Sequence, residues 1–248
     1  MNIGALIIGD ELLSGKRQDQ HFQHLQSVLA QRGLELSWTI IVGDEAEQLE
    51  QFLSFSLNTN DLVFSFGGIG ATPDDRTRQT VAKVANVDLY PHPDAVAEIE
   101  AQYGLEAYPN RILMGYLPVG SRIIPNSIVR VPGFSFNHHH FMPGFPAMSW
   151  PMIEWVLDNL YPELRDLSPQ DEQIIYVTHG RESDLLPVMI KIVEDYPTLR
   201  FSSLPHLGEE PHIELSLRGY TEQIDEAMDL LKSAIEQAHL TWSHQLDK

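Results

Sequence analysis

Three glycines that directly follow a short apolar run are the part of this sequence best suited to binding a phosphate. Residues 62–66 read Leu-Val-Phe-Ser-Phe, a run typical of a buried parallel strand, and Gly67, Gly68 and Gly70 come next. Because glycine has no side chain, the backbone N–H groups of such a turn can approach an anionic ligand closely. The segment therefore predicts a phosphate-binding loop at the end of a strand.

The residues after the glycines add carboxylates and the expected start of a helix. Thr72 is a candidate N-cap, Pro73 is the first helical residue, and Asp74 and Asp75 complete the first turn. Two carboxylates would repel a bare phosphate, whereas Mg²⁺ binds one or two carboxylates together with substrate oxygens. A cation that joins Asp74 or Asp75 to the phosphate reconciles the glycines with the acids. The sequence thus predicts a metal-bridged phosphate site.

An ordinary helix start explains the same acids without a ligand. Asp75 occupies the capping-box position, and the helix dipole stabilises each acid in the first turn by about 0.3–1 kcal/mol. This alternative leaves the glycines unexplained. The loop is not a P-loop, because no Gly-Lys-Ser/Thr follows, and it is not a dinucleotide fingerprint, because the third glycine of GxGxxG is missing.

Composition excludes several classes of protein. The 248 residues carry a formal net charge of −19, from 16 basic and 35 acidic residues, which disfavours nucleic acid and anionic membranes as partners. Cysteine is absent, so disulfides and thiolate chemistry are excluded. The N-terminus lacks the pattern of a signal peptide, and no apolar stretch approaches the ~20 residues of a membrane helix. We expect a cytoplasmic protein that does not bind membranes.

Strands and amphipathic helices alternate through the first two-thirds of the chain. The expected elements are strands over 6–8, 34–42 and 62–66 and helices over about 19–32, around 49–57 and from 72 onward. The first helix would bury Phe22 together with Leu25, Val28 and Leu29. Alternating strands and helices with short turns predict an α/β fold, a mostly parallel sheet with helices on both faces.

Acidic residues follow three of these strands, where an α/β sheet binds ligands. Asp10 and Glu11 lie in an expected loop over 9–15, and Asp44 follows the strand that ends at Val42. These carboxylates, with Asp19, could assist at a metal site. Taken one by one, each is better explained as a cap or turn residue.

Proline and glycine recur over 118–146, which favours edge strands or a hairpin there and a helix that begins near Ser149. Within this stretch, residues 137–140 read Asn-His-His-His and suggest a metal cluster. Neighbouring histidines in a turn point in different directions, so we interpret them as a polar turn. We interpret His206 and His212 in the same way.

A second, smaller unit is expected after residues 161–169, which contain two prolines and mixed charges. The expected division is 1–165 and 170–248. In the second part, strands and helices follow the order βαββα, with Ile213, Leu215 and Leu217 facing a core and Glu214, Ser216 and Arg218 facing solvent. No catalytic cluster is evident in this part.

These motifs together resemble the MoaB/Mog-like molybdopterin-binding domain, in the version at the N-terminus of CinA-type competence/damage-inducible proteins. The resemblance spans roughly residues 3–160 and is carried by motifs over 9–15, 42–44, 67–78, 132–134 and 143–146, with Asp19 and Asn126. The second part resembles the small KH-like domain of CinA proteins, with residues 180–183 at its strand-to-helix turn. The amidase domain of full-length CinA proteins is not found in this sequence, so its deamidation reaction is not expected.

The resemblance implies a three-layer α/β/α sandwich, followed by a small α+β (KH-like) domain, that binds a pterin or nucleotide pyrophosphate. The residues it assigns to the ligand are Gly67, Gly68, Gly70, Thr72, Asp10, Asn126, Pro143 and Gly144. Those it assigns to the metal are Asp74, Asp75 and Asp44, with Asp74, Asp75 and Glu11 as catalytic groups. Basic residues near these loops that could contact phosphate are Lys16, Arg17, Arg76 and Arg78, although each by itself is better explained as a solvated surface charge. The sequence departs from the CinA pattern at His21, Ala71 and Val129, where Asn, Pro and Gly are usual.

The function we expect is metal-dependent hydrolysis of a nucleotide pyrophosphate of the FAD or ADP-ribose class, with Mg, Mn or Co as the divalent metal. Two alternatives remain open at this stage. One is adenylyl transfer to, or binding of, molybdopterin in molybdenum-cofactor synthesis; the other is non-catalytic binding of a nucleotide or pterin. The resemblance also implies a homo-oligomer.

Overall fold

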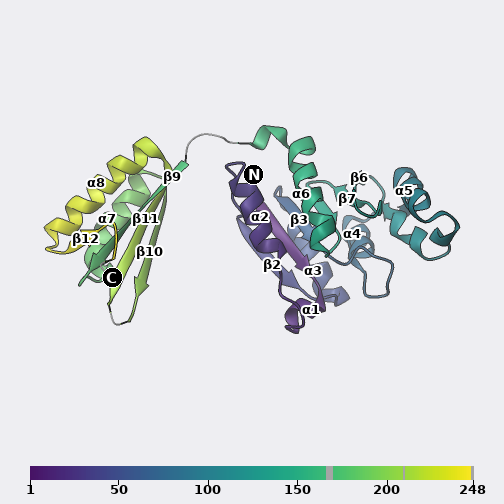
Figure 1. Cartoon of the computed structure of the whole chain (residues 1–248), viewed down its shortest axis with the longest axis horizontal. Helices are drawn as coiled ribbons and strands as arrows, with labels where there is room; N and C mark the ends of the chain where they lie inside the picture. The colour runs from purple at the N-terminus through teal and green to yellow at the C-terminus, as the bar shows by residue number, and fades with distance from the viewer. Residues whose placement is uncertain (166–169, 209, 247–248) are drawn as a thin grey trace. The chain divides into compact units, whose positions relative to one another are not determined.

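The computed structural model describes residues 1–165, 170–208 and 210–246. The chain forms two compact units, Met1–Asp166 and Leu167–Lys248, each with its own sheet (Figure 1). The expected boundary at 161–169 includes residues 166–169, which lie outside the described residues. Tyr161 and Leu164 pack against the core of the first unit, so the beginning of this segment belongs to that unit.

The first unit is built on a six-stranded sheet in the order β2-β1-β3-β8-β7-β6. Its strands are β1 (Ile3–Ile8), β2 (Trp38–Val42), β3 (Leu62–Phe66), β6 (Arg122–Ile124), β7 (Gly133–Phe136) and β8 (His139–Met142). Strands β2, β1, β3 and β8 are parallel, and β7 runs antiparallel to its neighbours β8 and β6. The prediction of a mostly parallel α/β sheet is confirmed.

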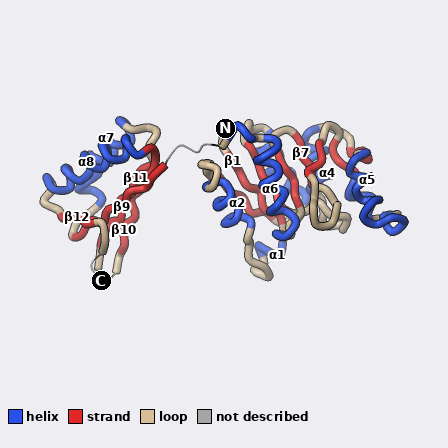
Figure 2. The backbone as a smooth tube through the Cα atoms, turned by 45° about the horizontal axis from the view of Figure 1, so that its top comes forward, coloured by secondary structure: helices blue, strands red, loops and turns tan. Residues whose placement is uncertain are grey.

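Helices cover both faces of this sheet. On one face α2 (His21–Ala30) and α6 (Pro146–Leu160) pack on the odd-numbered residues of β1 and the even-numbered residues of β3, and Figure 2 shows α6 lying across the strands. On the other face α3 (Ala46–Leu57) and α4 (Thr77–Ala85) cover Leu6, Ile8 and Val63. Because successive side chains of a strand point to opposite faces of the sheet, each face has its own hydrophobic core.

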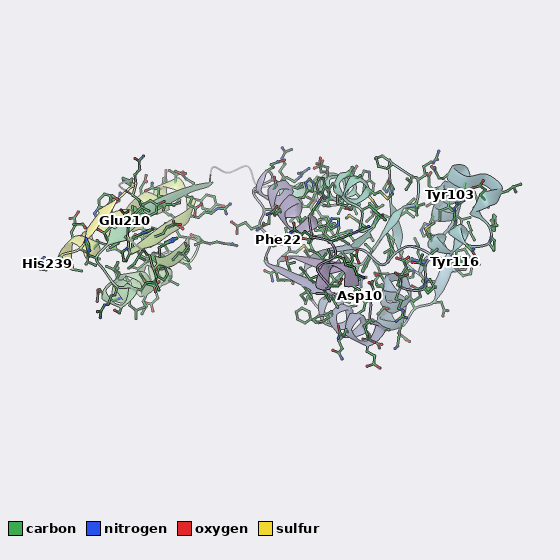
Figure 3. All side chains as sticks on the ribbon, turned by 60° about the horizontal axis from the view of Figure 1, so that its bottom comes forward. Asp10, Phe22, Tyr103, Tyr116, Glu210 and His239 are labelled. Atoms are coloured by element: carbon green, nitrogen blue, oxygen red, sulfur yellow. The ribbon has the colours of Figure 1, made fainter. Side chains whose placement is uncertain are left out.

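Several expected element boundaries are wrong. Residues 10–13 form a short helix, α1 (Asp10–Leu13), inside the expected loop, and β2 begins at Trp38, four residues later than residue 34. Helix α6 begins at Pro146, three residues before Ser149, so Pro151 lies inside it. Phe22, labelled in Figure 3, points away from the core. It is 38% exposed because the buried face of α2 begins instead with His21.

The expected helix start at Thr72 is also wrong. Residues 72–75 form an isolated turn, closed by a hydrogen bond from the Asp75 N–H to the Thr72 carbonyl, and α4 begins only at Thr77. The Thr77 N–H donates to the Gly68 carbonyl, so the glycine loop itself caps the helix.

The histidines over 138–140 do not form a polar turn. Only Asn137 and His138 lie in the turn between β7 and β8, and His139 and His140, each 1% exposed, belong to β8. The expected hairpin is nevertheless present, because β7 and β8 pair antiparallel across this turn, and β6 is an edge strand of the sheet. Strand β8 itself lies inside the sheet, paired with β3. Histidine is usually counted as a polar residue. The sequence of β8 therefore does not reveal that the side chains of His139 and His140 are buried.

After α4 the chain leaves the main sheet and forms a small subdomain, residues 89–118, which we call the excursion. It comprises β4 (Leu89–Pro91), α5 (Pro93–Tyr103), two 3-10 helices (Gly104–Ala107 and Arg111–Gly115) and β5 (Tyr116–Pro118), which pairs antiparallel with β4. Its small core contains Ile99, Ala107 and Ile112. The excursion leads the chain back to the sheet at β6.

The second unit is an α+β fold. Its antiparallel sheet has the order β10-β11-β9-β12, from β9 (Gln170–Thr178), β10 (Arg200–His206), β11 (His212–Tyr220) and β12 (Thr241–Ser243). Helices α7 (Glu182–Asp195) and α8 (Thr221–Gln237) give the expected βαββα order. Ser216, expected to face solvent, is buried, and His206 and His212 form a cross-strand pair and not turns.

Among the described helices, none combines the length and apolar character that a membrane crossing requires.

Candidate functional site

The loops after β1 and β2 are joined by two reciprocal hydrogen bonds. The Asp10 N–H donates to Asp44 Oδ2 at 2.9 Å, and the Asp44 N–H donates to Asp10 Oδ1 at 3.1 Å. Gly43 permits this contact, since a Cβ there would lie 2.4 Å from Asp10 Oδ1. Both acids therefore act as turn residues, as the alternative interpretation holds, and both are held at the carboxyl edge of the sheet.

Four of the expected carboxylates influence one another at this edge. The pKa of Asp44 is raised, first by burial and then by the charges of Asp10, Glu11 and Asp74, against a hydrogen bond from Asp10. The loops after three neighbouring strands thus place negative charge together. Asp19 differs, because its carboxylate accepts from the His21 and Phe22 N–H groups and so caps α2.

The glycine loop has a conformation that side chains do not tolerate. Gly67 and Gly68 have φ of 103° and 68°, and added Cβ atoms would lie 2.2 Å from the Ile8 carbonyl oxygen and 2.3 Å from Thr77 Oγ1. A Cβ at Gly70 would lie 2.4 Å from Asp75 Oδ2. The loop is fixed at its start, where the Gly67 N–H donates to Met142 O and Thr77 Oγ1 donates to Gly67 O.

Three N–H groups of this loop are available to a ligand. Within the described parts of the chain, no acceptor forms a hydrogen bond with the N–H of Gly68, Ile69 or Gly70. Gly68 and Gly70 are only partly covered and line a cavity. Consecutive N–H groups around glycines form the concave arrangement that binds anions in proteins.

Asp74 and Asp75 differ although they are neighbours. Asp75 Oδ2 accepts from the Thr72 N–H at 3.0 Å and from the Thr72 hydroxyl at 2.5 Å, so it closes the turn. Asp74 is exposed, and the Thr72 hydroxyl lowers its pKa, followed by its own backbone N–H. Asp74 therefore stays ionised and is the freer of the two carboxylates.

Arg78 is a clamp for the glycine loop and not a surface charge. It is 3% exposed, and its guanidinium donates to Gly70 O at 2.5 Å, to Tyr116 O at 3.2 Å and to Leu113 O. Burial lowers its pKa to about 10, and the charge of Asp75 opposes this shift. Arg78 joins the loop to the excursion. Lys16, Arg17 and Arg76 are exposed, as expected of surface charges.

Asn126 shapes a loop of its own. Its Oδ1 accepts from the Ile128 N–H at 3.0 Å and the Val129 N–H at 3.4 Å, and its Nδ2 donates to Val131 O at 2.9 Å. Asn126 is 6% exposed, so its direct contact is with this loop. Val129 and Val131 then line a cavity beside the glycines.

Two cavities flank the glycine loop. One, of about 230 Å³, is mostly apolar and is lined by Gly68, Ile69, Gly70, Asp75, Tyr103, Met114, Val129, Val131, Pro143, Gly144, Phe145 and Met148. The other, of about 370 Å³, is more polar and is lined by Ile7, Ile8, Glu11, Leu12, Arg17, Gln18, Asp19, Gln20, His21, Phe66, Gly144 and Pro146. Figure 3 labels Tyr103 on the excursion, whose side chains sequence reasoning did not place at the site. Gly144 lines both cavities.

The donors at this edge suit a metal that binds together with its ligand. Within residues 1–165, 170–208 and 210–246, no three Asp, Glu or His side chains converge closely enough to hold a metal ion by themselves. Mg²⁺ needs only one or two carboxylates when phosphate oxygens and water complete its coordination. The oxygen donors around Asp44 and Asp74 fit that arrangement, because a cation would also relieve their repulsion.

Comparison with known proteins follows the same division of the chain. Residues 4–166 match the family described as "Probable molybdopterin binding domain", which is well over half of the 248 residues. The chain belongs to this family. The predicted resemblance to the MoaB/Mog-like domain of CinA-type proteins is confirmed.

Similar proteins differ in how much of their length is shared. A protein of Caldivirga maquilingensis is 27% identical over 96% of this chain and 95% of its own length. A CinA-like protein of Syntrophotalea carbinolica is 29% identical over 71% of this chain, which spans only 45% of that relative. The crystal structure of the protein CinA with unknown function from Thermoplasma acidophilum has a TM-score of 0.59 and 27% identity, covering 64% of this chain and 99% of that one.

Proposed function

We propose that the glycine-loop edge binds the pyrophosphate of a nucleotide and hydrolyses it with a divalent metal. The observation that carries this proposal is the juxtaposition of two features at one edge. Among the residues that the structure describes, the N–H groups of Gly68, Ile69 and Gly70 have no acceptor, and carboxylates from three loops influence one another at the same edge of the sheet. N–H groups alone serve an anion and carboxylates alone serve a cation, so together they suit a phosphate–metal pair.

The residues divide this task between them. Asp74, exposed and ionised, is the main metal ligand, with Asp44 assisting, and Glu11 lies where it can accept a proton from water. The Asp75 carboxylate is already bound to Thr72, so it keeps the turn in shape at the cavity wall. A bound divalent cation would polarise the attacking water and offset charge on the phosphate oxygens. It would also supply the positive centre that a chain of net charge −19 needs to hold a phosphate.

A second candidate function is favoured by the apolar cavity. Its volume of about 230 Å³ and its lining of Met114, Val129, Phe145 and other apolar side chains suit a flat ring such as a pterin. The family description points to the same ligand. In that case the site would serve adenylyl transfer or molybdopterin binding, or would bind a nucleotide or pterin without turnover.

Incubation of the purified protein with FAD, ADP-ribose and ATP, each with Mg²⁺, Mn²⁺ or Co²⁺, separates these functions. Release of AMP that stops when EDTA removes the metal supports hydrolysis. Binding of a pterin or nucleotide without any AMP release under all three metals contradicts hydrolysis and favours the second candidate.

A further inference from the structure

His21 is a buried histidine at the site with no part in the chemistry proposed above. It is the first residue of α2 and is 5% exposed. Its ring stacks on Phe66, the last residue of β3, with centroids 4.4 Å apart and an interplanar angle of 10°. The ring therefore contacts the residue that directly precedes the glycine loop.

The two ring nitrogens face different partners. Nε2 lies 3.2 Å from the Gly144 carbonyl oxygen, which can only accept, so Nε2 carries the hydrogen. Nδ1 lies 3.4 Å from Ser149 Oγ, but the single hydroxyl hydrogen of Ser149 is donated to the Phe145 carbonyl at 3.1 Å. Burial lowers the pKa of His21, while the Gly144 contact and Asp19 oppose that shift. The bond to Gly144 is the firmer of the two contacts and holds a neutral ring.

Gly144 lines both cavities, and we refer to its backbone as the Gly144 wall. A Cβ added to it would lie 3.4 Å from Gly67 Cα, so the two loops touch backbone to backbone. The Gly67 N–H to Met142 O bond holds this contact from the β3 side, and His21 holds it from the α2 side. Movement of the Gly144 carbonyl would change the width of both cavities.

The polar cavity below this wall has the chemistry of a sugar site. Its lining offers a carboxylate from Glu11, a guanidinium from Arg17 and amides from Gln18 and Gln20. Charged and neutral hydrogen-bonding groups together suit a polyhydroxylated ligand, and the His21 ring lines the same cavity. A group attached to a pyrophosphate on the glycine loop would reach this cavity by passing Gly144.

We propose that His21 is a positioning residue that fixes the Gly144 wall and thereby determines how tightly the site binds the sugar beyond the pyrophosphate. This inference rests on the proposed function for the identity of the ligand. An asparagine in place of His21 would keep a donor for Gly144 O but could not stack on Phe66.

Two non-hydrolysable ligands test the proposal without turnover. The α,β-methylene analogues of ADP-ribose and ADP share adenosine and both phosphate groups. The first carries the terminal ribose where the second has a free, charged oxygen, so each variant is compared with the wild type for each analogue by calorimetry in Mg²⁺. His21→Ala is expected to weaken the ADP-ribose analogue about tenfold, the effect of one lost contact, and to change the ADP analogue by less than about twofold. His21→Asn should fall between His21→Ala and the wild type, and Gln23→Ala, an exposed change on the same helix, should match the wild type.

Equal weakening of both analogues, or no change in either, would overturn the role of His21. If the wild-type protein binds neither analogue, that result contradicts the proposed function but does not test the role of His21. Hydrogen exchange of the ligand-free protein then tests whether His21 positions the Gly144 wall. Faster exchange in His21→Ala confined to residues 143–149 supports the positioning role. Exchange that is unchanged there contradicts it.

Discussion

Strands β3 and β8 lie side by side in parallel, and the two ends of this pair have opposite chemistry. At the carboxyl end, Phe66 pairs with Met142, and the chain opens into the glycine loop and the loop of Pro143 and Gly144. At the amino end, Val63 pairs with His139, and polar rings are packed into the core. One end presents backbone and carboxylates to a cavity, whereas the other encloses its histidines.

The difference shows that residue type alone does not identify a site. Histidines are the stronger metal ligands by type, yet His140 is committed to Ser135 Oγ at 2.8 Å and the Tyr161 hydroxyl at 3.0 Å. Glycines offer no functional group, yet their N–H groups are the ones left for a ligand. In an open α/β sheet the carboxyl end of the strands is where ligands bind, and position along the strand decides between these two outcomes.

The largest effect is expected for Asp74→Asn, at the open end. The substitution keeps size and shape but removes the charge proposed to hold the metal. AMP release from FAD or ADP-ribose should fall by about 100-fold or more, while the urea midpoint stays at the wild-type value because Asp74 is exposed and lies outside α4. The measurements are the initial rate and the urea midpoint.

Asp94→Asn is the matched control, because Asp94 is an exposed acid in the first turn of α5, away from the glycine loop. Its rate should equal that of the wild type. A folded Asp74→Asn protein with the wild-type rate would contradict the assignment of the metal ligand.

A substitution in the glycine loop should act on stability. Gly67→Ala places a Cβ 2.2 Å from the Ile8 carbonyl oxygen, a backbone atom that cannot move aside, at a φ of 103°. We expect a loss of about 3 kcal/mol or more. Gly15→Ala is the control, since Gly15 has a φ of 72° with no atom near its Cβ and should cost only about 1 kcal/mol. Equal losses by urea denaturation would contradict a steric requirement at Gly67.

The enclosed end should make the protein sensitive to acid. Burial lowers the pKa of His139 to about 4, with His138 adding to the shift, and burial lowers that of His140 to about 3. In the part of the chain that the structure describes, neither ring nitrogen of His139 has a hydrogen-bond partner, and the nearby Ser56 backbone opposes only part of the shift. Both rings are neutral in the folded chain at pH 7.

The sign of the effect follows from which state binds more protons. An unfolded histidine has a pKa near 6.5, so between pH 6.5 and 4 the unfolded chain binds more protons, and stability falls as the pH falls. For His139 the loss should reach about 2 kcal/mol at pH 5 relative to pH 7.5. His139→Leu should reduce the acid sensitivity by that amount, and His244→Leu, at an exposed position, should not. Identical pH profiles of the urea midpoint for His139→Leu and the wild type would contradict this account.

Much of the first unit could be predicted because its patterns are local. Continuous apolar runs mark β1 and β3, and the glycines mark the loop between β3 and α4. The sequence also predicted that Asp10, Asp44 and Asp74 lie at one edge of the sheet, because each follows a parallel strand and the carboxyl ends of parallel strands share an edge.

The remainder depends on contacts between distant residues. Thr72 is a residue type that commonly caps helices, yet the helix begins at Thr77. There the Thr77 N–H donates to Gly68 O, and the Arg78 side chain donates to the carbonyls of Leu113 and Tyr116. No local pattern contains these partners. His139 shows the same limit, because a histidine that packs in a core looks in sequence like one in a turn.

The smallest effect is expected at Asn137, which together with His138 forms the turn in the Asn-His-His-His run. Its φ is 53°, in the left-handed region that glycine adopts freely and asparagine tolerates. Asn137→Gly should therefore change the free energy of unfolding by less than about 0.5 kcal/mol, whereas Asn137→Ala should cost about 1 kcal/mol because alanine is strained there. Urea denaturation at pH 7.5 measures both variants. A large loss in Asn137→Gly would mean that the Asn137 side chain, and not its backbone conformation, holds the turn, and the contrast between this turn and the buried His139 beside it would then be wrong.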